Sequence, residues 1–411
     1  MRPRGPPLLV VALELLCVHP LWACPQLCQC LNLQVLCQEA GYKTLPPMEQ
    51  IPRGVHALLL MSNQIESVAS DAFRGLVRVR KLILDNNRIS WLAPFAFRGL
   101  TNMDELSLQN NPLTVLSPQS FSGLARIRLL QLGFNQIGRV ESMAFSGSND
   151  IGTLSLEGNP LTELRPRAFG GLNRLGWLRL PREVTCPQPD AFSGLKNVSL
   201  LVLESIRCDR IPQFAFRGLE AAGKIHIRDA NLGLVDSGAF AGLNHARSVI
   251  FEGCRIDVVR AAAFAGMRAV VELRLRNNRI GRLLPGALDA LDEASVSYVV
   301  LQENWLPCDC TLRWAPDTFR QTAFCSAPAR WLNSSAAQVP LSSLPRCAPQ
   351  HWTPVQAANG AQRRPGPNSE RSGASAAMSL PSLFVMALDV LLAVYCRCRI
   401  RHDGWNSPPA A

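Results

Sequence analysis

The strongest constraint on the fold is an apolar pattern that returns every 24 residues. Its unit is L-x-x-L-x-L-x-x-N-x-[IL], as in the segment from Val79 to Ile89. Eleven units align on the fourth position, at Leu58, Leu82, Leu106, Leu130, Leu154, Leu178, Leu201, Ile225, Val249, Leu273 and Val299. A second register, usually A-F-x-G-[LM], places Phe73, Phe97, Phe121, Phe145, Phe169, Phe192, Phe216, Phe240 and Phe264. Self-similarity at a fixed period indicates a repeat architecture.

The repeat predicts a stack of short strands. In the L-x-L step, Leu82 and Leu84 point into the core while Ile83 points to the other face. The Asn amide can satisfy backbone groups of the following turn, and the Phe fills the convex side. One unit cannot bury its own apolar edge, so its neighbours stabilise it. We therefore expect a solenoid with a parallel β-sheet on its concave face and a cover at each end.

The N-terminus indicates export. Residues 1–23 combine early arginines, an apolar run from Leu8 to Val18 and the small Ala23, which are the features of a signal peptide. Export suits the 14 cysteines, because disulfides persist in oxidising compartments. The 47% hydrophobic content excludes a mostly disordered chain, and 28 glycines are too few for collagen.

A second apolar segment, residues 376–396, predicts a membrane anchor. It follows a Pro-, Gly- and Ser-rich segment at 348–375, which we expect to be a disordered linker. Arginines then begin a cytoplasmic tail at 397–411, as in a type I single-pass protein. The small residues 372–374 leave a glycolipid (GPI) anchor signal as the alternative. Secretion without an anchor is a third interpretation.

Cysteine clusters flank the repeats. They contain Cys24, Cys28, Cys30 and Cys37 before the first unit, and Cys308, Cys310, Cys325 and Cys347 after the last. From the residues alone, each quartet allows three disulfide pairings, and a zinc site is chemically conceivable.

With the 24-residue register, these clusters resemble the extracellular leucine-rich repeat family with cysteine-rich N- and C-terminal caps, which includes slit, chondroadherin and the Nogo receptor. The resemblance implies an α/β leucine-rich repeat horseshoe, with caps at 24–54 and 304–347 around repeats at 55–303. The disulfides it implies are Cys24–Cys30, Cys28–Cys37, Cys308–Cys325 and Cys310–Cys347.

Four successive units depart from the pattern. Their Asn positions hold Glu183, Ile206, Ala230 and Cys254. We expect the turns there to be weaker. Cys186 and Cys208 lie in adjacent units, and we expect them to form a further disulfide. Cys254 has no evident partner and is interpreted as a buried thiol in the place of Asn, rather than as a reactive thiol.

The positions around L-x-L on the open sheet face form the candidate ligand-binding surface. It comprises Leu129, Phe134, Trp177, Arg179, Leu200, Val202, His226, Arg228 and Ile250. Trp and Arg beside aliphatic residues are typical of protein-binding hot spots. Alternatively, Trp177 packs against the prolines of the sixth unit. Asn197 and Asn333 begin glycosylation sequons.

The chain carries no catalytic signature. It lacks H-E-x-x-H and G-x-S-x-G motifs and a phosphate-binding glycine-rich loop, and its six histidines are scattered. We therefore expect neither an enzyme nor a cofactor or metal. The net charge of +11 admits heparan sulfate as a partner, although the basic residues form no compact cluster. Export and the lack of a binding module exclude nucleic acid.

The resemblance implies a cell-surface receptor or adhesion protein that binds an extracellular protein ligand or a cell-surface partner through the concave face. A tail of 15 residues cannot form a signalling domain, so signalling would require a co-receptor. The alternative is an extracellular-matrix-organising protein that binds collagen or proteoglycan.

Overall fold

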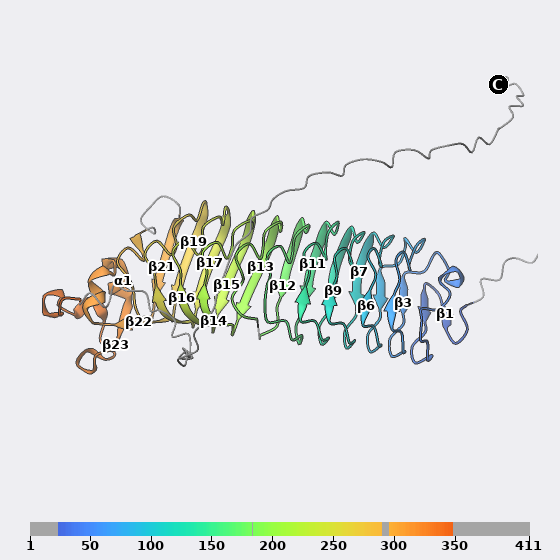
Figure 1. Ribbon diagram of the computed structural model, residues 1–411, viewed down its shortest axis with the longest axis horizontal. Helices are drawn as coiled ribbons and strands as arrows, with labels where there is room; N and C mark the ends of the chain where they lie inside the picture. Colours follow the sequence, from blue (N-terminus) through green and yellow to red (C-terminus); the bar gives the residue numbers. More distant parts are fainter. Residues whose placement is uncertain (1–23, 183, 290–295, 348–411) are drawn as a thin grey trace, which may run out of the picture. The chain divides into compact units, whose positions relative to one another are not determined.

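The computed structural model describes residues 24–182, 184–289 and 296–347 (Figure 1). These residues belong to one compact unit. The signal peptide, linker, anchor and tail predicted from the sequence lie outside the described residues. Within the described part of the chain, no helix is both long and apolar enough to cross a membrane.

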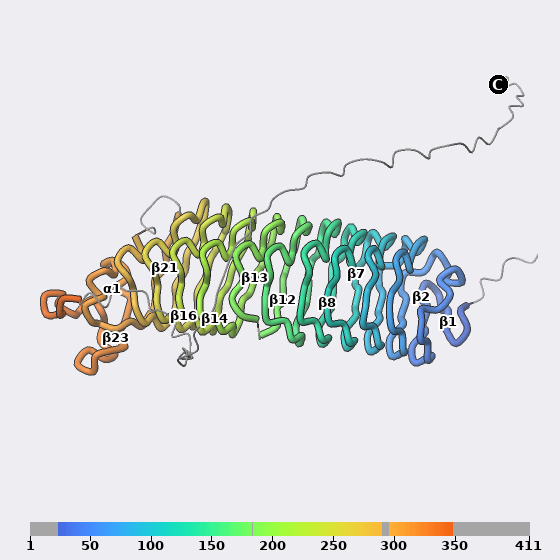
Figure 2. The backbone as a smooth tube through the Cα atoms, viewed as in Figure 1, coloured from blue at the N-terminus to red at the C-terminus, as the bar shows by residue number. Residues whose placement is uncertain are grey.

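The repeats form a solenoid in which the backbone coils from the N-terminal cap to the C-terminal cap (Figure 2). In the described residues, thirteen strands pair in one large sheet, parallel from β2 onward, with β1 antiparallel to β2. These strands are β1 (Gln29–Leu31), β2 (Gln34–Leu36), β3 (Ala57–Leu59), β5 (Lys81–Ile83), β7 (Asn102–Ser107), β9 (Arg126–Gln131), β11 (Asp150–Ser155), β12 (Arg174–Arg179), β13 (Asn197–Glu204), β15 (Ala221–Arg228), β17 (Ala246–Glu252), β19 (Val270–Arg276) and β21 (Val296–Gln302).

The repeat spacing sets the register of this sheet. Leu130, Leu154, Leu178 and Leu201 pair in sequence across neighbouring strands, and all four are fully buried. The interval of 23 residues between Leu178 and Leu201 therefore leaves the strand pairing intact. Equivalent residues of successive units become lateral neighbours on the sheet, so a row of side chains on its outer face can be read from the sequence.

The phenylalanines of the second register form a continuous stack inside the solenoid. All nine are buried, and neighbouring rings lie 4.9–6.3 Å apart between centroids, with interplanar angles of 5–18°. The backbone around them forms turns rather than helices. The helical part of this α/β fold is accordingly small: within the described residues, the one α-helix is α1 (Asp317–Thr322) in the C-terminal cap.

The repeat asparagines connect each unit to its neighbours. The Nδ2 of Asn111 donates to the carbonyl oxygens of Leu84 at 3.0 Å and Leu108 at 3.1 Å, and its Oδ1 accepts from the Ile89 amide at 3.0 Å. Similar bonds form at Asn63, Asn87, Asn135, Asn159, Asn278 and Asn304. Each buried amide thus satisfies backbone groups that the turns leave unpaired.

Where asparagine is missing, a second sheet replaces its hydrogen bonds. Ile206, Ala230 and Cys254 are buried, and the segment after each becomes a strand of this sheet. Its strands are β14 (Arg207–Ile211), β16 (Asn231–Val235), β18 (Arg255–Val259), β20 (Arg279–Ile280), β22 (Asn304–Pro307) and β23 (Ala323–Ala327). The expectation of weaker turns is therefore wrong, because parallel strand pairing satisfies the backbone there.

The same side of the N-terminal half has only two-residue pairs. These are β4 (Ser67–Val68) with β6 (Trp91–Leu92), and β8 (Val115–Leu116) with β10 (Arg139–Val140). The described solenoid is thus stabilised by asparagines in its first half and by a second sheet in much of its second half.

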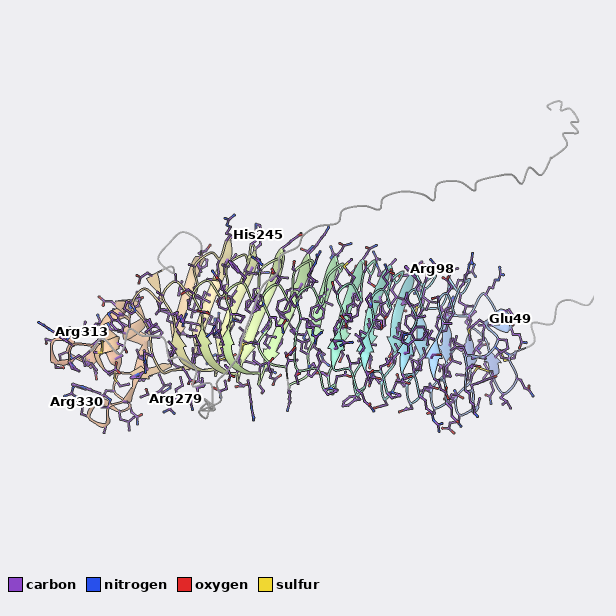
Figure 3. All side chains as sticks on the ribbon, in the orientation of Figure 1. Glu49, Arg98, His245, Arg279, Arg313 and Arg330 are labelled. Carbon is purple, nitrogen blue, oxygen red and sulfur yellow. A yellow bond between two sulfur atoms is a disulfide. The ribbon has the colours of Figure 1, made fainter. Side chains whose placement is uncertain are left out.

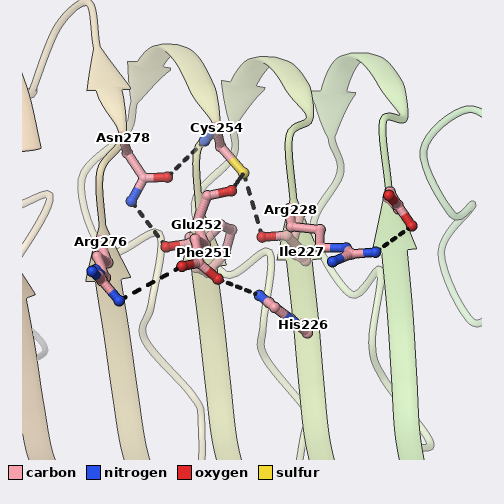
Figure 4. Close-up of polar contacts among 9 residues, drawn as sticks. His226, Ile227, Arg228, Phe251, Glu252, Cys254, Arg276 and Asn278 are labelled. Carbon is pink, nitrogen blue, oxygen red and sulfur yellow. Dashed lines mark hydrogen bonds and ion pairs between the residues drawn. The ribbon is translucent and has the colours of Figure 1, made fainter.

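Cys254 acts as an asparagine substitute. Its Sγ donates to the carbonyl oxygens of Ile227 at 3.4 Å and Glu252 at 3.5 Å, and its amide donates to Oδ1 of Asn278 at 2.9 Å (Figure 4). Burial raises the pKa of this thiol to about 11. The thiol is therefore protonated at neutral pH and unsuited to nucleophilic chemistry.

Disulfides close both ends. The structure contains Cys24–Cys30 and Cys28–Cys37 at the N-terminal cap, Cys308–Cys325 and Cys310–Cys347 at the C-terminal cap, and Cys186–Cys208 between adjacent units. Short 3-10 helices complete the caps: η2 (Met48–Gln50), η4 (Cys310–Trp314), η5 (Ala329–Trp331), η6 (Ala336–Gln338) and η7 (Leu341–Ser343).

Candidate ligand-binding surface

The open face of the large sheet carries two adjacent rows of side chains from β12, β13 and β15. Strand pairing aligns the three residues of each row, which come from successive units of the repeat. The rows are Trp177, Leu200 and Lys224, and Arg179, Val202 and His226.

A hollow of about 600 Å³, here called the central hollow, opens on this face. Seven of the nine predicted binding residues line it: Phe134, Trp177, Arg179, Leu200, Val202, His226 and Arg228. Leu129 and Ile250 do not. Ile250 departs from the prediction because it is only 7% exposed, with the longer side chains of His226 and Arg274 on either side of it in the row.

Sequence reasoning missed three charged residues of the central hollow. Glu157, Glu204 and Lys224 also line it. Lys224 could have been found from the repeat register, because it occupies the position of Trp177 and Leu200 in the next unit. The two glutamates lie at the ends of their L-x-L segments and could have been found in the same way.

Trp177 and Arg179 form a cation–π pair. The guanidinium carbon of Arg179 lies 4.1 Å from the centroid of the indole ring. Nη1 of Arg179 also lies 3.4 Å from Oε2 of Glu157 on the neighbouring unit. Pro181 of the sixth unit lines the same hollow, so the aromatic ring and the proline belong to one surface. Desolvated cation–π pairs of this kind are common at protein-binding sites.

Charged side chains surround the apolar floor formed by Leu200 and Val202. Nη2 of Arg228 lies 2.7 Å from Oε2 of Glu204. Four basic residues line the central hollow, namely Arg179, Arg182, Lys224 and Arg228, against the two acidic residues Glu157 and Glu204. The lining is therefore net positive, by two charges if His226 is neutral.

His226 is held in its neutral form. Burial lowers its pKa below the ordinary histidine value, and the nearby Lys224 lowers it further, against the opposing effect of Glu252. Its Nε2 lies 3.0 Å from Oε2 of Glu252, and Glu252 also faces Arg276 (Figure 4). At neutral pH the imidazole therefore acts as a hydrogen-bonding group and adds no charge to the central hollow.

Phe134 is an exposed aromatic in an unusual backbone conformation. Its side chain is 61% exposed and its φ is +54°, in the left-handed region. The equivalent positions of neighbouring units hold Asn86, Asn110 and Gly158, residue types that tolerate this conformation. A Cβ built on Gly158 would lie 2.6 Å from Cδ1 of Phe134, so the ring rests against this glycine.

The two sequons lie outside the central hollow. Asn197 is exposed at the start of β13 and lines a different hollow with His245 and Arg268, at the edge of the sheet. Asn333 is exposed in the C-terminal cap, near Trp305 and Arg279. Figure 3 shows His245 and Arg279 at opposite edges of the stack.

The described residues offer binding groups rather than catalytic ones. In this part of the chain, no group of three or more His, Cys, Asp or Glu side chains could hold a metal ion. The lining of the central hollow includes no Ser, Thr or Cys to act as a nucleophile beside His226. Its chemistry is that of aromatic, aliphatic and guanidinium contacts.

Comparison with known proteins matches the repeats to one family. The model described as Leucine rich repeat matches residues 77–137 and 127–183. No curated protein matches the chain.

Solved structures similar to the chain include three leucine-rich repeat assemblies or proteins. A chain of the octameric complex of latrophilin 3, Unc5D and FLRT2 (LRR) has 20% identity and a TM-score of 0.45, with 78% of this chain and 100% of that chain covered. Human 5T4 (trophoblast glycoprotein) has 18% identity and a TM-score of 0.35, with 79% and 100% covered. The mouse RP105/MD-1 complex has 18% identity and a TM-score of 0.45, with 71% and 47% covered.

The repeat register, the family match and the disulfides at both ends agree. The chain is a leucine-rich repeat protein with cysteine-rich caps.

Proposed function

We propose that this protein is a cell-surface receptor or adhesion protein that binds an extracellular protein ligand through the central hollow. The observation that carries the proposal is the convergence of Phe134, Trp177 and Arg179 on one hollow of an open sheet face. Tryptophan, arginine and exposed aromatic residues dominate the energetics of protein interfaces. With no signalling domain of its own, the protein would act through a co-receptor.

The cysteines support an extracellular location. Ten of the eleven cysteines in the described residues form disulfides, and the exception, Cys254, is buried. Disulfides in such numbers are typical of exported proteins. We also propose that Asn333 and Asn197 carry glycans, since both are exposed and neither lines the central hollow.

The binding proposal is tested by screening the full chain, displayed on cells, against a collection of extracellular proteins. Trp177→Ala combined with Arg179→Ala should abolish binding of the ligand that the screen identifies. The matched control is Tyr298→Ala, because Tyr298 is 68% exposed in the same row as Trp177 but lies outside the central hollow. If the double variant reaches the surface, folds and still binds, the central hollow is not the binding site.

The anchor is tested on the same cells. A type I helix should keep the protein on washed cells after treatment with phosphatidylinositol-specific phospholipase, whereas a GPI anchor should be cut. Protein found mainly in the medium would contradict the cell-surface proposal and favour a matrix protein.

A further inference from the structure

Three buried N–H donors gather at the central hollow without an acceptor. They are Nε1 of Trp177, Nε of Arg179 and Nε of Arg228, and none has a hydrogen-bond partner among the described residues. The other two unpaired buried donors in this part of the chain belong to Arg320 and Trp331, in the C-terminal cap. Buried donors are nearly always paired, so three at one hollow require an explanation.

The two guanidinium groups are only partly used. Each is paired with a glutamate through one terminal nitrogen, Arg179 with Glu157 and Arg228 with Glu204. Their side chains are 40% and 42% exposed, so a ligand can reach them and a side-chain rotation can present Nε. Lys224 lines the same hollow and forms no salt bridge with a described residue.

We propose that the central hollow binds a carboxylate, the side chain of an Asp or Glu in the protein ligand, while an adjoining apolar residue of that ligand packs on Leu200 and Val202. The proposal rests on the proposed function and names the chemistry of the segment that is bound. The Nε and a terminal nitrogen of one arginine form the fork that takes both oxygens of a carboxylate. The indole N–H supplies a further donor.

The charges favour this ligand over two others. The excess of basic residues disfavours a lysine or arginine side chain. Glu157 and Glu204 also line the hollow, so a doubly charged phosphate group would meet more repulsion than a single carboxylate. The apolar floor matches an aliphatic or aromatic residue beside the acidic one.

The test uses the full chain, purified in detergent micelles, and a phage-displayed random-peptide library as the probe. The selected peptides should be enriched in Asp or Glu next to an apolar residue. Replacing that Asp or Glu by Asn or Gln in the synthetic peptide should weaken binding about tenfold or more, because charge-assisted hydrogen bonds are lost. Arg179→Gln combined with Arg228→Gln should remove this difference between the acidic and amide peptides.

Arg274→Gln is the matched control, because Arg274 lies in the same row as Arg179 but outside the central hollow. It should keep the preference for the acidic peptide. Circular dichroism and thermal melting establish that each variant is folded, and Lys224→Gln provides a second, milder test of charge.

Selection without acidic enrichment, or equal binding of the acidic and amide peptides, overturns the proposal. If Trp177→Ala abolishes peptide binding while the amide peptides bind as well as the acidic ones, the hollow binds protein but not through a carboxylate. If Trp177→Ala has no effect on peptide binding, the proposed function fails as well.

Discussion

Phe134 occupies a backbone position that most side chains avoid. A non-glycine residue in the left-handed region costs about 1–2 kcal/mol, least for Asn and Asp. We predict that Phe134→Asn stabilises the protein by about 1 kcal/mol and weakens ligand binding, because an exposed aromatic contact is lost. Urea unfolding and a binding assay on the same variant measure the two effects.

The reverse change in the preceding unit is the control. Asn110 has the same backbone conformation, with φ +55°, and does not line the central hollow. Asn110→Phe should destabilise the protein and leave binding unchanged. If Phe134→Asn lowers stability, the packing of the ring against Gly158 outweighs the backbone cost.

The thiol of Cys254 should resist alkylation in the native protein. With its pKa raised to about 11, less than about a thousandth of the thiol is ionised at pH 8. The rate of alkylation by iodoacetamide should therefore rise about tenfold per pH unit and keep rising above pH 9, where an ordinary cysteine levels off. Peptide mapping by mass spectrometry locates the label, and unfolded protein provides the reference. Rapid labelling of Cys254 at pH 7 would contradict this assignment.

The residues of the central hollow show what sequence can give at this scale. Once the repeat is aligned, Trp177 and Arg179 are assigned to an exposed row, because strand side chains alternate. Ile250 occupies an equivalent position and is buried, since its exposure depends on the size of its neighbours rather than on register. The stacking of Arg179 on Trp177 likewise depends on side-chain torsions that the repeat does not specify.

Among the elements, the buried asparagine of each regular unit stabilises the turn that follows its strand. The Nδ2 of Asn135 donates to the carbonyl oxygens of Leu108, Leu132 and Gly133, and its Oδ1 accepts from the Asn111 amide. We predict that Asn135→Ala costs about 1–3 kcal/mol, because it leaves these backbone groups buried and unpaired.

The control is Asn231→Ala, which removes an exposed side chain in β16 of the second sheet. It should change stability by less than about 0.5 kcal/mol. Chemical unfolding followed by circular dichroism measures both variants. Equal effects would show that the amide bonds add little to the turns.

The second sheet could not be predicted from the sequence. The segments that form β14, β16 and β18 are short and mixed in polarity, with Arg207, Asn231 and Arg255 at their first positions. Their pairing exists only because the large sheet holds successive units side by side. The large sheet itself was predictable, since a 24-residue period and buried leucines define every neighbouring pair.

For the whole molecule, stability should vary along the stack, because each unit contacts mainly its neighbours. Cys310→Ser combined with Cys347→Ser removes the disulfide that closes the C-terminal cap, a bridge worth about 3–4 kcal/mol for its loop length. We predict faster hydrogen exchange in β21 and β19 than in the unmodified protein, and unchanged exchange in β7 and β9.

A mid-stack disulfide gives the comparison. Cys186→Ser combined with Cys208→Ser should instead raise exchange around β12, β13 and β14. Hydrogen–deuterium exchange with mass spectrometry resolves both patterns. Uniform loss of protection in either variant would show that the solenoid unfolds as one cooperative unit.

The central hollow lies where two kinds of reinforcement meet. Toward the N-terminus, the turns are tied by asparagines up to Asn159, and beyond Cys208 they are tied by the second sheet. The lining of the hollow runs from Phe134 to Arg228 and so spans this seam. A ligand seated there would act as a splint across the junction. Tension along the stack would then load the ligand directly, and we expect the occupied protein to resist mechanical extension more strongly than the empty one.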